Sequence, residues 1–298
     1  NLATTAEITR TVRMNWIELY YLLSARKILT ETKTVFGHLV KTATSMLSVG
    51  TEFQHNVFRA QLELTQVESK LIEIEEDIKI VRANLARLVG PKIARIVHPR
   101  NLPKWSNPSA ESSIRKNIMQ HPVIKSDDSA IEANQKGIEL SEELYKPAWS
   151  LGLQYSFRQG RMSQRKRSDF VGVQITTELP FFTSNRQDKR VTASLEQYKA
   201  SKSQKEINLL NLSKEVSHSY AAWMQLKKQE NLYKTKLVPE AKQYAEAALN
   251  AYENTQVAFL TVAKAYDMKL TTLLQSVRIE TKRQKARAYL LYLEAEEQ

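Results

Sequence analysis

A strict heptad pattern between residues 57 and 88 constrains the fold more than any other feature of the sequence. Its apolar side chains follow one another at alternating intervals of three and four, and they are Val57, Ala60, Leu64, Val67, Leu71, Ile74, Ile78, Val81, Leu85 and Leu88. A period of 3.5 residues indicates a helix that supercoils against neighbouring helices. Gly90-Pro91 ends this helix. We therefore expect a very long helix of the coiled-coil type.

A second long helix precedes this one. Residues 5–47 contain no proline and only one glycine, Gly37, and the turn signal at residues 49–51 separates them from the heptad segment. Two long helices joined by a short turn form an antiparallel helical hairpin. The sequence therefore predicts a first helical hairpin over residues 1–90.

Residues 183–298 predict a second helical hairpin of the same design. A helix is expected from the N-cap Ser184 to about Glu253, with a kink at Pro239. A second turn near residues 254–257 then leads into a last helix.

The two hairpins form an internal repeat with an offset of 205 residues. At this offset Thr255 falls on Gly50, and Val262 falls on Val57. A β-hairpin precedes the second copy, whereas the chain begins inside the long helix of the first copy. We therefore expect that an N-terminal part with an equivalent β-hairpin is missing from this chain.

Three further segments lie between the two helical hairpins. Residues 91–126 hold five prolines and predict an irregular connector with short elements, residues 127–146 predict a helix, and residues 147–182 predict a β-hairpin. Apolar and polar residues alternate along both strands, and the apolar ones are Trp149, Leu151, Leu153, Tyr155, Phe157, Val171, Val173 and Ile175. Each run has about ten residues, enough to cross a bilayer as a tilted strand. We expect these side chains to face lipid, with a hairpin on a soluble core as the alternative.

The loop between the strands is strongly basic over residues 161–167. Lysine and arginine clusters bind the phosphates of anionic lipids, so contact with lipopolysaccharide phosphates is one interpretation of this loop. A merely solvated loop is the other.

Composition and spacing exclude several classes of function. The chain has no cysteine, which excludes disulfide scaffolds and thiolate metal sites, and its five histidines lack metal-site spacing. No glycine-rich phosphate loop, nucleophile elbow or short His–carboxylate pair is present, so we expect no enzyme activity and no cofactor. The net charge of +12 is spread along helices that are also rich in glutamate, which argues against nucleic-acid binding.

Four short pieces of the sequence, in this order and spacing, resemble one known family. They are the first tip at residues 48–61, the start of the β-hairpin at 145–152, its end at 179–186 and the second tip at 259–262. The chain is similar to the outer membrane factor family, the TolC-like outer membrane efflux proteins. The end of the hairpin, Leu179-Pro180-Phe181-Phe182, resembles the heavy-metal cation efflux branch of that family.

The resemblance implies a mainly α fold. Very long antiparallel coiled-coil helices would form the α-barrel of a homotrimer in the periplasm, and each chain would add its β-hairpin to a shared 12-stranded β-barrel in the outer membrane. Residues 91–126 would belong to an equatorial belt. A periplasmic adaptor and an inner-membrane transporter are the partners that the resemblance implies, with outer membrane lipid around the barrel.

The same resemblance implies two groups of functional residues at the helical tips. The adaptor-contact residues would be Val49, Gly50, Thr51, Glu52, Asn254, Thr255, Gln256 and Val257. The pore gate would be formed by Asn56, Arg59, Thr261 and Lys264. Family members often carry acidic residues at these gate positions, and Thr255 stands where glycine is common, so this chain departs from the family pattern at both sites.

These observations predict a passive exit duct of a tripartite efflux pump. Metal cations are the first expected substrate, and drugs or small organic molecules are the second. A periplasmic adaptor and a coiled-coil scaffold protein are the alternatives. An adaptor does not explain the repeated helical hairpin, and a scaffold does not explain the β-hairpin.

Overall fold

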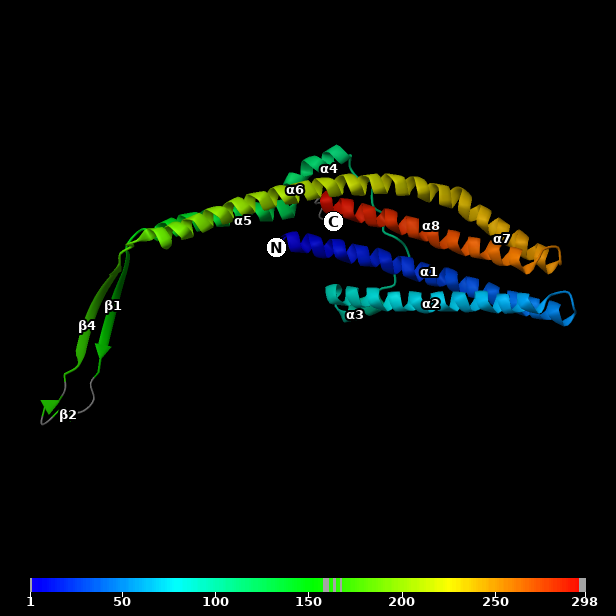
Figure 1. Ribbon diagram of the computed structural model, residues 1–298, viewed down its shortest axis with the longest axis horizontal. Helices are drawn as coiled ribbons and strands as arrows, with labels where there is room; N and C mark the ends of the chain where they lie inside the picture. The colour runs from blue at the N-terminus through cyan, green and yellow to red at the C-terminus, as the bar shows by residue number, and fades with distance from the viewer. Residues whose placement is uncertain (1, 158–160, 163–164, 167, 295–298) are drawn as a thin grey trace. The chain divides into compact units, whose positions relative to one another are not determined.

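A computed structural model describes residues 2–157, 161–162, 165–166 and 168–294. The chain is mostly helical, with one long β-hairpin (Figure 1). In chain order the elements are α1 (Leu2–Ser48), α2 (Gln54–Val89), α3 (Pro91–Ile96), α4 (Glu111–Asn117), the 3₁₀-helix η1 (Ile118–Gln120), α5 (Pro122–Glu143), β1 (Ala148–Ser156), β2 (Arg161–Met162), β3 (Arg165–Lys166), β4 (Phe170–Glu178), the 3₁₀-helix η2 (Thr183–Asn185), α6 (Gln187–Leu232), the π-helix η3 (Tyr233–Leu237), α7 (Val238–Glu253) and α8 (Phe259–Leu293).

The chain divides into two compact units. The first consists of Asn1–Pro122 with Asn211–Gln298, and the second is Val123–Leu210. The division falls inside α6, so the segment expected to start a second helical hairpin at residue 183 contributes its first part to the unit that holds the β-hairpin.

In the first unit, long helices lie side by side as a layer. Helix α2 packs on α1, α1 packs on α8, and α8 packs on α7 (Figure 1). Both helical turns, between α1 and α2 and between α7 and α8, lie at the same end of this layer. All ten residues of the heptad pattern in α2 are buried or half-buried, so the predicted stripe is the face that packs.

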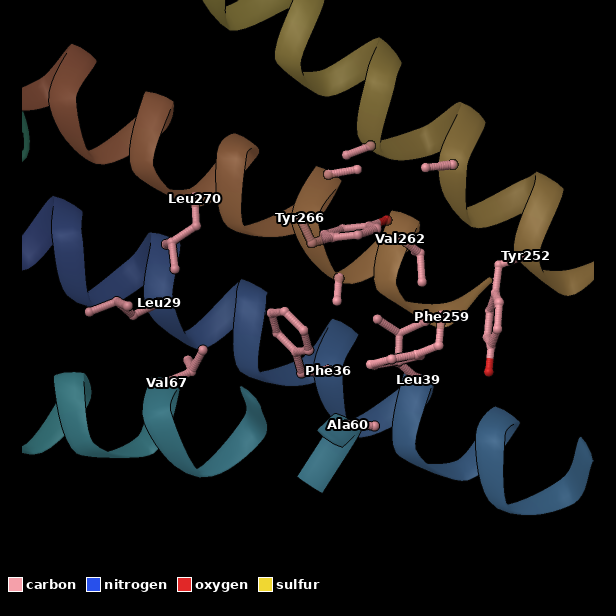
Figure 2. Close-up of a cluster of buried hydrophobic side chains, with 14 residues drawn as sticks. Leu29, Phe36, Leu39, Ala60, Val67, Tyr252, Phe259, Val262, Tyr266 and Leu270 are labelled. Atoms are coloured by element: carbon pink, nitrogen blue, oxygen red, sulfur yellow. The ribbon is translucent and has the colours of Figure 1, made fainter. Parts of the chain in front are cut away.

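The core of this layer is an apolar cluster near the turns (Figure 2). Phe36 of α1 meets Tyr266 of α8 edge to face, with ring centroids 6.4 Å apart. Leu39, 0 % exposed, and Val67 of α2 pack into the same cluster. Truncating a buried aromatic residue such as Phe36 to alanine costs about 3–5 kcal/mol, so this cluster holds the two helical hairpins together.

The connector is more regular at its end than the sequence predicts. Helix α5 begins at Pro122, five residues before the expected start at residue 127, and ends at Glu143. Proline is favoured at the first position of a helix, because its missing N–H would be unpaired there anyway. The prediction that Pro122 belongs to the irregular connector was therefore wrong, because this residue begins α5.

The connector is also anchored to the end of α8. His121 is fully buried, and its Nε2 lies 3.1 Å from the carbonyl oxygen of Tyr292. Burial lowers the pKa of His121, and the hydrogen bond to Tyr292 opposes this shift only in part. Glu294 accepts a hydrogen bond from the Ser109 N–H at 2.9 Å and pairs with buried Arg287 at 2.9 Å. Contacts across about 180 residues thus fix the path of the chain.

The α6–α7 rod contains an irregularity where the sequence predicts a kink. The π-helix Tyr233–Leu237 precedes Pro239, which lies in the first turn of α7. A proline inside a helix removes one backbone hydrogen bond, and a π turn accommodates this. At the other end, Ser184 is not the N-cap of the helix, because η2 occupies Thr183–Asn185 and α6 begins at Gln187.

The β-hairpin pairs β1 with β4 in antiparallel register. Leu151 lies opposite Ile175, and Leu153 lies opposite Val173. The loop strands β2 and β3 pair with each other. The basic loop 161–167 is predicted to contact lipopolysaccharide phosphates or to be merely solvated. Its side chains lie outside the described part of the structure. In the described part of the chain, no helix is both long enough and apolar enough to cross a membrane.

Candidate functional site

The first tip is the turn that joins α1 to α2. Gly50 adopts φ 78°, a left-handed conformation that glycine tolerates without steric cost. The Thr51 N–H donates to the carbonyl oxygen of Met46 at 2.9 Å and closes the turn. Val49 and Phe53 project from it with 72 % and 70 % of their surface exposed. The tip therefore presents apolar side chains to its surroundings.

Glu52 is the centre of a hydrogen-bond cluster at this tip. Its carboxylate accepts bonds from the backbone N–H of Phe53 at 2.8 Å and from the Asn56 side-chain amide at 2.7 Å. Its second oxygen accepts a bond from the Tyr252 hydroxyl at 2.9 Å. Because Tyr252 belongs to α7, Glu52 joins the first tip to the second one across 200 residues.

The charged form of Glu52 is favoured. Burial raises the pKa of this carboxyl, but the bonds from Asn56, Phe53 and Tyr252 together outweigh burial and lower the pKa below its ordinary value. Burial and the bond to Glu52 raise the pKa of Tyr252. Tyr252 is therefore a donor and Glu52 an acceptor throughout the neutral range.

The second tip joins α7 to α8 with the same pattern of backbone bonds. The Gln256 N–H donates to the carbonyl oxygen of Ala251 at 2.8 Å, and Thr255 adopts φ 60°. Tyr252 packs edge to face on Phe259, with ring centroids 5.7 Å apart. The buried pair of rings fixes the end of α7 against the start of α8 (Figure 2).

The structure places all predicted adaptor-contact residues in these two turns or next to them. Each is exposed or half-buried, and they are Val49, Gly50, Thr51, Glu52, Asn254, Thr255, Gln256 and Val257. Two tip residues are absent from that set. Phe53 has no distinctive sequence signal, and Tyr252 lies in the apolar stripe of its helix, which suggests only a core residue.

The four predicted gate residues lie in the first two turns of α2 and α8. Asn56 is engaged by Glu52 and is half-buried. Arg59 and Lys264 are exposed, and Thr261 is half-buried. Arg59 and Lys264 bring positive charge to the second turn of α2 and of α8.

The β-hairpin carries a second candidate surface. Because side chains alternate across a strand, the register places the predicted apolar residues within β1 and β4 on one face, and Phe157 directly follows β1. Tyr155 lies opposite Val171, and Trp149 lies opposite Thr177. Every predicted member of this face is at least 63 % exposed, and they are Trp149, Leu151, Leu153, Tyr155, Phe157, Val171, Val173 and Ile175.

Ion pairs join α8 to both neighbouring helices, and the sequence gives no sign of them. Glu18 of α1 pairs with Arg278 at 2.8 Å and with Lys285. Glu230, at the end of α6, pairs with Arg283 of α8 and with Lys234 at 2.8 Å. Except for Lys234, which lies four residues after Glu230, these partners lie far apart in the chain, so spacing could not reveal the pairs with α8.

Burial raises the pKa of the Glu18 and Glu230 carboxyls, but the bonds from Lys285 and Arg278, and those from Lys234 and Arg283, outweigh it and lower both pKa values. Among the described residues, no group of three or more His, Asp or Glu side chains is placed to hold a metal ion.

Comparisons with known proteins agree on one family. A sequence model of the family described as "Outer membrane efflux protein" matches residues 114–293, which is more than half of the chain. No curated protein sequence matches.

Solved structures show the same fold. VceC of Vibrio cholerae is 19 % identical, with a TM-score of 0.79 over 98 % of this chain and 71 % of its own. The CmeC outer membrane channel of Campylobacter jejuni is 12 % identical, with a TM-score of 0.80 over 98 % of this chain and 63 % of its own. The MtrE outer membrane channel of Neisseria gonorrhoeae is 14 % identical, with a TM-score of 0.72 over 98 % of this chain and 67 % of its own.

The long helical hairpins with paired tips, the β-hairpin and the family match lead to one assignment. The chain belongs to the outer membrane efflux protein family, a family of channels, and it is an outer membrane protein with a helical extension in the periplasm.

Proposed function

We propose that this chain is the exit duct of a tripartite efflux pump and conducts substrate passively from the periplasm to the outside. Members of the family are trimeric channels that work with adaptor and inner-membrane pump partners. The duct would do no chemistry, and the inner-membrane transporter would supply the energy through the adaptor.

One observation carries this proposal beyond the family match. The two helical hairpins end at one level, and the Glu52–Tyr252 hydrogen bond ties their tips together. The tips therefore form a single surface with exposed Val49 and Phe53. Such a surface suits the apolar contacts of an adaptor at the periplasmic end of the duct, with the eight tip residues as its contact set.

The gate is proposed to lie just inside the tips, at Asn56, Arg59, Thr261 and Lys264. In a trimer Arg59 and Lys264 would each occur three times around the axis, and a ring of positive charge repels cations. Replacing Lys264 with Asp should therefore raise the cation selectivity of single channels in planar bilayers. Unchanged selectivity would remove Lys264 from the gate.

The β-hairpin is proposed to anchor the duct in the outer membrane. Its exposed apolar face has aromatic residues near the ends, Trp149 and Phe157, as expected for residues at membrane–water interfaces. Replacing Leu153 with Arg, at the middle of the strand, should impair membrane insertion by about 2–4 kcal/mol. The same replacement at Gln154, whose side chain lies on the opposite face of the strand, is the matched control.

The function is tested by deletion of the gene and re-expression of the chain from a plasmid. Loss of resistance to metal cations, restored by the plasmid, would identify metals as substrates, and loss of resistance to drugs alone would identify the second class. Full resistance of the deletion strain to both panels, in cells without a second exit duct, would refute the proposed function.

A further inference from the structure

The layer of helices in the first unit has two unlike free edges. Helix α2 packs on α1 and forms one edge. The continuous rod of α6, η3 and α7 packs on α8 and forms the other edge. The outer side of α6 carries α4 at one level, where Arg115 and Glu111 bond to Ser213 and Ser217. The part of α6 between this contact and η3, and the outer side of α2, are left for another molecule.

The free face of α2 carries a row of apolar and acidic side chains. Ile72 and Ile80 are 69 % and 51 % exposed, and exposed Glu76 lies midway between them at intervals of four. Residues four apart lie on the same side of a helix. Relative to the packed heptad stripe, this row is on the opposite side of α2.

The free face of α6 carries the complementary row. Met224 and Leu232 are 39 % and 47 % exposed, and exposed Lys228 lies midway between them, again at intervals of four. Buried Trp223 and Glu230 mark the packed side of the helix, and the row lies away from both. Among the described residues, no ion pair within the chain uses Glu76 or Lys228.

The two rows stand at the same height above the tips. Glu76 lies 25 residues after Thr51, and Lys228 lies 26 residues before Asn254. At 1.5 Å per residue both are about 38 Å from the tips, and the π-helix Tyr233–Leu237 absorbs the extra residue. The Glu52–Tyr252 bond holds the two tips level.

Equal height matters because rotation about an axis parallel to the helices does not change it. In a cyclic assembly the α2 edge of one chain therefore meets the α6–α7 edge of the next chain at the same level. This places Ile72 beside Leu232, Glu76 beside Lys228 and Ile80 beside Met224 of the neighbouring chain.

We infer that these two rows form the interface between neighbouring copies of this chain, with the Glu76–Lys228 ion pair setting its register between two apolar contacts. The inference rests on the proposed trimeric duct, and it adds which residues join its subunits. A second copy is the occupant that the rows fit, because each copy carries both the acidic and the basic row. Head-to-tail contacts of this kind close into a ring when the rotation between neighbouring copies closes, as it would in the proposed trimer.

The absence of cysteine from the chain permits a direct test. The full chain carrying both Glu76→Cys and Lys228→Cys is purified in detergent and oxidised. A disulfide requires Cα atoms within about 7 Å, so bonds between chains report contact of these two positions. The expected result is a ladder of dimers and trimers on a denaturing gel without reductant, at severalfold higher yield than in the control.

The control pairs Glu75→Cys with Lys228→Cys, because Glu75 is also exposed but lies a quarter-turn or more away from the row. Cross-linking no stronger than this control, in a preparation that light scattering shows to be trimeric, would overturn the inference and leave the exit duct intact. Absence of any oligomer in the unmodified protein would overturn both. Cross-links to a co-expressed adaptor instead of a second copy would also overturn the inference.

Charge reversal provides an independent measurement. Glu76→Lys alone and Lys228→Glu alone should each reduce the trimer fraction on dilution, because like charges then face each other across every interface. The double variant should recover it. Failure of the double variant to recover the trimer, with helix content unchanged by circular dichroism, would contradict the ion pair.

Discussion

The two helical tips make the same turn with different residues. In each, an N–H donates to a carbonyl oxygen five residues earlier, Thr51 to Met46 and Gln256 to Ala251, as in the Schellman motif that ends many helices. The left-handed residue before that donor is Gly50 in the first tip and Thr255 in the second. A β-branched residue in this conformation costs roughly 1–2 kcal/mol. The second tip is therefore strained and the first is not.

The first tip has a cluster of hydrogen bonds to a carboxylate, whereas the second tip is held by the packed rings of Tyr252 and Phe259. Glu52 accepts three hydrogen bonds around the first turn, one of them from Tyr252 of the other hairpin. The bond from Tyr252 thus adds the support of the relaxed tip to the ring packing that holds the strained one. Strained residues persist where surrounding contacts fix them, often at functional sites, so the comparison suggests that Thr255 marks the part of the tip that moves.

Removing the Glu52 side chain should have the largest effect on the stability of the two tips. Glu52→Ala loses the bonds from Phe53, Asn56 and Tyr252, and bonds to a charged group contribute about 1.5–3 kcal/mol each. We expect the tip to lose at least about 2 kcal/mol of local stability, measured by native-state hydrogen exchange of both turns. Glu75→Ala is the control. Faster exchange at the first tip alone would show that Glu52 does not hold the second.

Swapping the residue types at the two left-handed positions, Gly50 and Thr255, should have the next largest effect. Gly50→Thr should destabilise the first tip by about 1–2 kcal/mol, and Thr255→Gly should stabilise the second by about 1 kcal/mol. Hydrogen exchange of the two turns measures both changes. If Thr255→Gly left the second tip unchanged, strain at Thr255 would not distinguish the tips.

Acid should weaken the connection between the tips by a smaller amount. The pKa of Glu52 is lower in the folded chain than its ordinary value of about 4.3. The stability from its charge is thus fully present above the ordinary value and lost as pH falls through the folded one. Because Glu52 is partly exposed, we expect a loss of less than about 1 kcal/mol. In the Glu52→Gln variant, the stability of the two turns measured by hydrogen exchange should not depend on pH across this range.

Sequence alone predicts the helices and the turns well, and it predicts their contacts poorly. The heptad pattern of α2 and the repeat that places Thr255 on Gly50 depend on local spacing, which the chain displays directly. Pro122 was misassigned because proline both ends helices and begins them. The Glu52–Tyr252 bond joins residues 200 positions apart, and only folding shows that a tyrosine in an apolar stripe turns its hydroxyl to the other tip.

The side-chain hydrogen bonds at the end of α1 and directly after α7 should contribute least to the stability of the tips. The Ser48 hydroxyl donates to the Ser45 carbonyl oxygen at 2.7 Å, and the Asn254 amide donates to the Asn250 carbonyl oxygen at 2.7 Å. Both bonds are exposed, so water replaces them when they are lost. Ser48→Ala and Asn254→Ala should each change local stability by less than about 0.5 kcal/mol. A much larger loss for Asn254→Ala in hydrogen exchange would mean that the second tip has its own support and does not depend on Glu52.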